Sequence, residues 1–201
     1  AYPRSGSTLL RRLLERLFGV FTGSDTSPRK YLSEELRRFG LAGEGVVDRS
    51  VLLVKSHFPE RRGSVRFSAD GVVLLVRSPL FALDSLLNMY LTRSHTQRLA
   101  ESEYESLAGF VSDFCHSEVA VWRLFHQHWL SQAAAGVPMV VIRYEDLCCK
   151  ERFPQTLRGL AAFTSTALPP GHAALEGLPR RLEALCSASA SVRQLGAYPP
   201  R

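Results

Sequence analysis

Three short apolar runs do most to limit what this chain can fold into. Each lacks alternation of polar and apolar residues, and together they cover residues 51–54, 72–76 and 139–142. Continuous β-branched runs of this length are typical of strands covered on both faces, as in a parallel sheet. Helical patterns lie near residues 82–91, 104–130 and 153–163. The alternation predicts an α/β fold with a doubly wound, mainly parallel sheet flanked by helices.

The start of the chain reads as a strand end, a tight loop and a helix. Leucines recur at helical spacing after Gly6, charged residues such as Arg11 fall on the other face, and Gly19 is a suitable end. We expect one domain over residues 1–201 that lacks its first strand. A membrane anchor or a signal sequence upstream of residue 1 is therefore not excluded. Residues 164–201, rich in Pro, Gly, Ala and Ser, are expected to form a loosely structured C-terminal edge.

Composition and charge limit the kinds of binding partner and the kinds of metal or redox site that this chain is expected to have. The formal net charge of +6 favours anionic partners, although it is equally consistent with solubility alone. The arginines are spread along the chain, which argues against nucleic acid. The four cysteines show no C-x-x-C spacing, so a zinc or redox motif is not expected. No apolar run reaches the ~18 residues that a membrane span needs.

The loop before the first helix has the composition of an anion-binding loop. Small residues let backbone N–H groups converge on an anion, and the helix dipole favours negative charge there. Ser5, Gly6, Ser7 and Thr8 would form such a loop, and Arg4 would add a fixed cation. The alternative is a turn in which the hydroxyls only cap the helix. The Walker pattern is not met, because no Lys follows Gly6.

The next strand end carries a candidate base. Lys55 and His57 follow the run at 51–54. A histidine accepts a proton near neutral pH, and a lysine two residues away supplies a cation. Taken singly, a histidine in a loop is more often an ordinary surface residue.

The following strand end carries a second candidate for an anion. Arg77 follows the run at 72–76, and Ser85 comes eight residues later, inside a helix that Pro79 would begin. Both side chains could reach one further phosphate. The alternative is an Arg77 that pairs with a carboxylate such as Asp84.

These segments, in this order, resemble the motifs of sulfotransferases that use 3′-phosphoadenosine 5′-phosphosulfate (PAPS). Residues 2–8 resemble their 5′-phosphosulfate loop, and residues 55–59 resemble the segment that holds their catalytic histidine. Arg77 with Ser85 resembles their 3′-phosphate motif, and residues 144–147 are similar to their Tyr-Glu-Asp-Leu segment. The resemblance is closest to the branch that contains WSC domains.

The resemblance implies a P-loop-like sulfotransferase fold and transfer of a sulfonate group from PAPS to an acceptor hydroxyl, with PAP as product and no metal. The acceptor would be a glycan and the compartment the Golgi, with the cytoplasm as the alternative. A membrane anchor would lie outside this chain, and nucleic acid would not be a partner. The catalytic residues would be His57, Lys55 and Arg4. The PAPS-binding residues would be Arg4, Ser5, Gly6, Ser7, Thr8, Arg77, Ser85, Tyr144 and Arg193.

The chain also departs from the family's pattern. Cytosolic members usually have lysine in place of Arg4, the tryptophan that stacks on adenine is Leu9 here, and the C-terminal Arg-Lys-Gly has only a faint counterpart at 193–196. Two alternatives therefore stay open: a catalytically inactive relative that binds nucleotides or glycans, and a P-loop-type kinase. The aromatic and histidine side chains of one helix could flank the acceptor or belong to the core: Trp122, His126 and Trp129.

Overall fold

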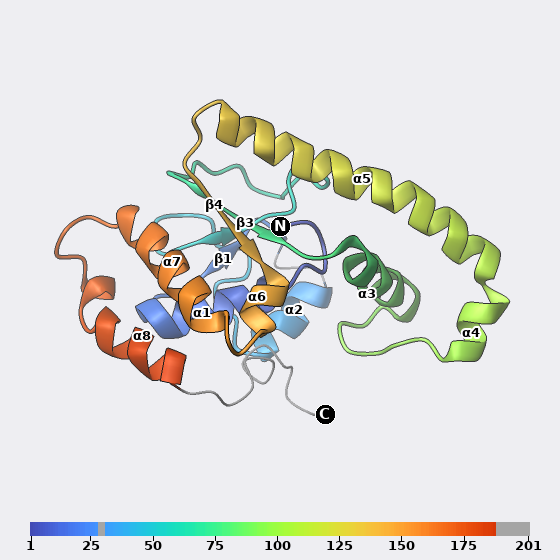
Figure 1. Ribbon diagram of the computed structural model, residues 1–201, viewed down its shortest axis with the longest axis horizontal. Helices are drawn as coiled ribbons and strands as arrows, with labels where there is room; N and C mark the ends of the chain where they lie inside the picture. The colour runs from blue at the N-terminus through green and yellow to red at the C-terminus, as the bar shows by residue number, and fades with distance from the viewer. Residues whose placement is uncertain (28–30, 188–201) are drawn as a thin grey trace.

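A computed structural model shows the chain as a mixed α/β structure, in which residues 1–27 and 31–187 are described. Helices dominate, and the strands form two small parallel pairs (Figure 1). In chain order the elements are α1 (Ser7–Phe18), β1 (Gly23–Ser24), α2 (Tyr31–Arg38), β2 (Val54–Lys55), β3 (Val72–Val76), α3 (Pro79–Thr92), α4 (Glu101–Ser106), α5 (Ala108–Ala134), β4 (Met139–Arg143), α6 (Tyr144–Cys148), α7 (Phe153–Thr166), the 3-10 turn η1 (Ala173–Leu175) and α8 (Leu178–Ser187).

Helix α1 forms where the leucine spacing predicts it. It ends at Gly19, whose left-handed backbone (φ 69°) lets its N–H donate to the Glu15 carbonyl, as a helix C-cap requires. Its apolar face is fully packed, and each leucine there contributes about 1.5–3 kcal/mol by leaving water. The buried leucines are Leu9, Leu10, Leu13, Leu14 and Leu17.

Strands β3 and β4 pair in parallel over their whole length, from Val72 opposite Met139 to Val76 opposite Arg143. Side chains alternate between the faces of a strand, so neighbouring residues reach different cores. Leu75 joins the core formed with α1 and α7, whereas Leu74 joins the core formed with α3 and α5. Helices therefore pack on both faces of this pair. Figure 1 shows α5 along one side of the molecule, and α1, α7 and α8 on the other.

The predicted strand at 51–54 is much shorter than expected. The Asp48 carboxylate accepts hydrogen bonds from the Ser50 N–H and hydroxyl, which holds a turn just before the run. Pairing with β1 becomes regular only at Val54 and Lys55. In the described residues the β1–β2 and β3–β4 pairs stay separate, so a mixed α/β structure is shown and the doubly wound P-loop-like sheet remains a prediction.

Three other details differ from the sequence-based expectation. The helix predicted over 104–130 is two helices, α4 and α5, which meet at Leu107 with φ −105° and ψ 14°. Helix α2 was not predicted. Within the predicted loose edge, the structure describes the end of α7, then η1 and α8, up to residue 187. None of the described helices is both long and apolar enough for a membrane span.

Candidate functional site

One cavity of about 460 Å³ brings together most of the residues singled out from the sequence. Its wall is built by the loop before α1, the ends of β2 and β3, helix α3 and the first residue of α6. The predicted site residues that line it are Arg4, Gly6, Ser7, Thr8, Lys55, His57, Arg77, Ser85 and Tyr144. Ser5 is fully buried and does not line the cavity, and Arg193 lies outside the described residues.

The loop before α1 has the geometry of a backbone anion site. Gly6 is the N-cap, with φ 99°, and no side chain caps the helix. The interpretation of Ser7 and Thr8 as capping residues is therefore wrong. Without a capping side chain, the first N–H groups of α1 stay available at the positive end of its dipole. A Cβ on Gly6 would lie 2.3 Å from Tyr144 Cδ2, so only glycine fits against that ring.

Arg4 is anchored at several points. Its backbone is left-handed, with φ 62°, which is uncommon for a residue with a side chain. Its Nε donates to the Ser85 hydroxyl at 3.0 Å, and its Nη2 donates to the His95 carbonyl at 3.0 Å. These contacts tie the loop before α1 to helix α3 and the loop that follows α3.

Arg77 connects the end of β3 to the same loop. Its Nη1 donates to the Arg4 carbonyl at 2.8 Å, and its guanidinium lies 4.6 Å from the centre of the Tyr144 ring. Its buried Nε has no hydrogen-bond partner among the described residues. The alternative pairing with Asp84 is wrong, because that carboxylate pairs with Arg98 at 2.7 Å. A buried guanidinium N–H that the described residues leave without an acceptor is uncommon in a folded protein.

His57 has one defined tautomer. Its Nδ1 lies 2.7 Å from the Ala1 carbonyl oxygen, which can only accept, so Nδ1 carries the hydrogen and Nε2 keeps its lone pair. Burial, assisted by the nearby Lys55, holds the pKa of His57 well below its usual value. The imidazole is therefore neutral at neutral pH, and a neutral imidazole can accept a proton through Nε2.

Lys55 lies in a cluster of charges that only the structure reveals. Burial lowers the pKa of Lys55 to about 8, while the nearby Glu44 opposes that shift. The Lys55 ammonium therefore stays mainly charged at neutral pH. Glu44 itself forms a fully buried ion pair with Arg11, and both residues line the cavity. Arg11, which the sequence places on the face of α1 away from the leucines, is nevertheless buried, because the loop that carries Glu44 covers that face.

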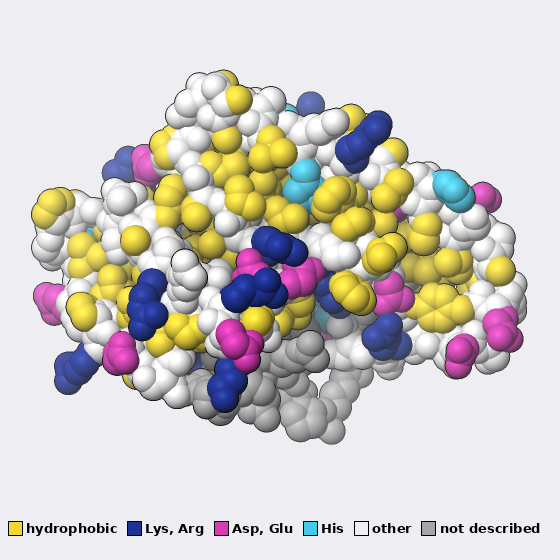
Figure 2. Space-filling view, viewed as in Figure 1, with side chains coloured by type: hydrophobic (Ala, Val, Ile, Leu, Met, Phe, Trp, Pro, Cys, Tyr) yellow, Lys and Arg dark blue, Asp and Glu magenta, His cyan; other side chains and the backbone are white. Residues whose placement is uncertain are grey.

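The cavity as a whole is cationic. Its lining carries six arginine or lysine side chains against two carboxylates, those of Asp25 and Glu44. Such a cavity concentrates field lines and favours a ligand with several negative charges. On the face shown in Figure 2, basic side chains of the described residues are instead scattered among acidic and apolar ones. The six cations are Arg4, Arg11, Lys55, Arg61, Arg62 and Arg77.

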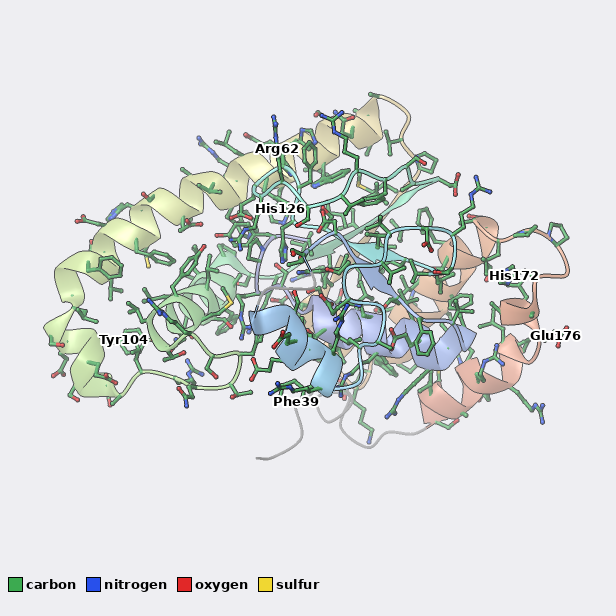
Figure 3. The ribbon with its side chains drawn as sticks, turned by 180° about the vertical axis from the view of Figure 1, so that it is seen from behind. Phe39, Arg62, Tyr104, His126, His172 and Glu176 are labelled. Carbon is green, nitrogen blue, oxygen red and sulfur yellow. The ribbon has the colours of Figure 1, made fainter. Side chains whose placement is uncertain are left out.

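Trp122, His126 and Trp129 of α5 lie in the core or pack against it. Trp122 and Trp129 pack against the cluster that contains Tyr2 and Leu74, and neither lines the cavity. His126 is buried, and Figure 3 shows it beneath α5. The sequence left a core role and an acceptor-binding role open for these side chains, and their packing favours the core.

Comparison with known proteins gives distant relatives. No protein-family model matches the chain, and no solved structure matches it. WSCD family member GA21586 of Drosophila pseudoobscura pseudoobscura is 30% identical over 148 residues, which are 73% of this chain and 44% of that protein. WSCD family member CG9164 of Drosophila melanogaster is 29% identical over 148 residues, which are again 73% of this chain and 44% of that protein. WSCD family member AAEL009094 of Aedes aegypti is 29% identical over 165 residues, which are 81% of this chain and 48% of that protein.

The chain thus spans about half the length of the curated relatives that it matches. The similar stretch covers most of this chain, so it is shared well beyond any single motif. The chain is a distant homologue of proteins named WSCD family members.

Proposed function

We propose that this chain is a sulfotransferase domain that transfers a sulfonate group from PAPS to an acceptor hydroxyl. One observation carries the proposal: Arg4, His57 and Arg77, from three separate segments, line a single cavity at the N-terminus of α1. The order of the motifs along the chain and the WSCD homologues support the same family.

The residues present fit a nucleotide that carries anionic groups at both ends. The uncapped start of α1, from Gly6 to Thr8, would bind the 5′-phosphosulfate. Arg77 and Ser85, which both line the cavity, would bind the 3′-phosphate. Leu9 lines the cavity and would offer an apolar contact to adenine.

The chemistry that follows needs a base and fixed positive charge. The nucleotide would supply the sulfonate group. His57 Nε2 would take the proton of the acceptor hydroxyl while its oxygen forms the new bond to sulfur. The bond between sulfur and the phosphate oxygen would break, and its electron pair would stay on PAP. Arg4 and Lys55 would offset the charge that grows on the sulfonate and on the departing phosphate. Positioning and fixed charge dominate such transfers between anionic groups.

The acceptor and the compartment belong to the proposal as well. Following the resemblance, the acceptor would be a glycan hydroxyl and the site of action the Golgi. Thr26, whose hydroxyl accepts from Lys55 Nζ at 3.4 Å, lines the cavity and can hydrogen-bond to a polyhydroxylated acceptor.

Transfer of labelled sulfonate from PAPS to a panel of glycans, phenols and steroids tests the proposal. We expect labelled product with at least one glycan and no requirement for Mg²⁺. Binding of PAP without transfer to any acceptor would instead favour the inactive relative. Hydrolysis of ATP with Mg²⁺ and no response to PAP would favour the kinase.

A further inference from the structure

The loop after α3 supplies a partner for Arg4 that no motif predicted. Arg4 Nη1 lies 2.7 Å from His95 Nδ1, and Arg4 Nη2 donates to the His95 carbonyl at 3.0 Å. Arg4 Nε donates to the Ser85 hydroxyl at 3.0 Å. All three guanidinium nitrogens are therefore bonded to α3 or to the loop that follows it, and His95 receives two of the three bonds.

The chemistry of the two side chains fixes their roles in this contact. A guanidinium can only donate, so His95 Nδ1 must accept, and the hydrogen of the neutral ring lies on Nε2. Burial, followed by the charges of Arg4 and Lys55, lowers the pKa of His95 to about 4. The neutral, accepting form is therefore the one present at neutral pH.

The backbone on both sides of the contact needs this support. Arg4 has a left-handed backbone, a conformation that persists only where surrounding contacts hold it. Arg93, also left-handed with φ 52°, ends α3 and begins the turn that carries His95. The Ser94 hydroxyl accepts hydrogen bonds from the N–H groups of Thr96 and Gln97, which fixes the shape of that turn.

We propose that His95 is a positioning residue that holds the Arg4 guanidinium at the wall of the cavity through its Nδ1 and its carbonyl oxygen. Arginine suits this contact and lysine does not, because a planar fork donates to two acceptors at once whereas an ammonium is a single point charge. The consequence for transfer rests on the proposed function: a fixed Arg4 would place its charge where the phosphosulfate binds. The contact itself does not depend on the ligand.

Two substitutions of His95 distinguish a role in positioning Arg4 from a general effect on the stability of the fold. His95→Asn keeps an acceptor close to the place of Nδ1, whereas His95→Leu removes it at similar size. Gln97→Ala, in the same loop, removes an exposed side chain and leaves the Ser94 hydroxyl and the Gln97 N–H in place, so it is the matched control. The readouts are the ¹⁵Nη–¹H signals of Arg4 in the ligand-free protein, since Nη1 and Nη2 make the contacts with His95, and the affinity for PAP by calorimetry, both at pH 7.

We expect slowly exchanging Arg4 Nη–H signals in wild type, His95→Asn and Gln97→Ala, and loss of the Nη1–H signal in His95→Leu. Because hydrogen bonds to charged groups are among the strong ones, PAP affinity should fall about tenfold or more in His95→Leu and stay within about threefold in the other two variants. An unchanged Arg4 signal in His95→Leu would overturn the inference, and so would equal losses of affinity in all three variants. If wild type fails to bind PAP, the proposed function fails, and the Arg4 signal alone decides the positioning role.

Discussion

Gly6→Ala should damage both the fold and the cavity, and the structure allows the cost to be worked out. With φ at 99°, any residue with a side chain is strained at this position. That strain costs about 1–2 kcal/mol. In addition, the new Cβ would lie 2.3 Å from Tyr144 Cδ2 and 2.6 Å from its Cε2, so the ring must move. Such overpacking costs about 1–3 kcal/mol more.

The expected total is about 2–5 kcal/mol of the free energy of unfolding. For a chain of this size, each kcal/mol corresponds to about 2–4 °C in melting temperature. Gly19→Ala is the matched control, because Gly19 caps the other end of the same helix with φ 69°, and a methyl group added there would meet nothing within 4 Å. The control should therefore lose only the conformational cost, about 1–2 kcal/mol.

Thermal and urea denaturation of the two variants measure this difference. A third variant, Gly6→Ala with Tyr144→Ser, removes the clashing ring, so relative to Tyr144→Ser alone the Gly6→Ala change should cost only about 1–2 kcal/mol, as Gly19→Ala does. It should not recover PAP binding, because Arg77 also loses the ring 4.6 Å from its guanidinium. Equal melting temperatures for Gly6→Ala and Gly19→Ala would refute the reasoning, because the close packing of Tyr144 on Gly6 would then cost nothing.

Three further predictions concern the titratable residues of the cavity. His57→Ala should lower the rate of sulfonate transfer by about 10²–10⁴-fold with PAP affinity nearly unchanged, and full turnover would remove His57 from the role of base. Glu44→Ala leaves the buried Arg11 charge without its partner, so urea denaturation should show a loss of about 3–5 kcal/mol, and a loss below 1 kcal/mol would contradict the buried pair. The pKa values of His57 and His95 lie below 6.5 in the folded state, so the unfolded chain binds more protons and stability should fall as pH drops below about 6.5. His95→Asn should therefore show a smaller drop in melting temperature between pH 7 and pH 5 than wild type does. An equal or larger drop would contradict the lowered pKa of His95.

The helices and strands that the sequence predicted well are those with strong local patterns. The leucine spacing of α1, the proline that starts α3 and the apolar runs of β3 and β4 all act through neighbouring residues. The short β2 follows from the turn at Asp48 and from its pairing with β1, and the break at Leu107 is a local change of backbone angles; periodicity records none of these. Local sequence patterns thus predicted the main helices and strands, but not the short strand β2 or the break between α4 and α5.

The candidate site likewise contains residues that the sequence predicted and residues that it could not predict. The motif residues follow strand ends, and the carboxyl ends of parallel strands carry ligand sites, so their meeting in one cavity could be anticipated. Arg11 and Glu44 could not be paired from sequence, because their contact depends on how the loop after α2 covers α1. His95 was missed because its place depends on the left-handed turn at Arg93.

Calorimetric titration with three nucleotides tests the central claim most directly. PAP carries phosphates at both positions, adenosine 5′-monophosphate lacks the 3′-phosphate, and ATP with Mg²⁺ is the ligand of the kinase alternative. The account predicts that PAP binds most tightly, and that Arg77→Ala removes most of the difference between PAP and the monophosphate, about 10-fold or more for a charge-assisted contact. Equal binding of PAP and the monophosphate by wild type, or binding of ATP with Mg²⁺ alone, would contradict it.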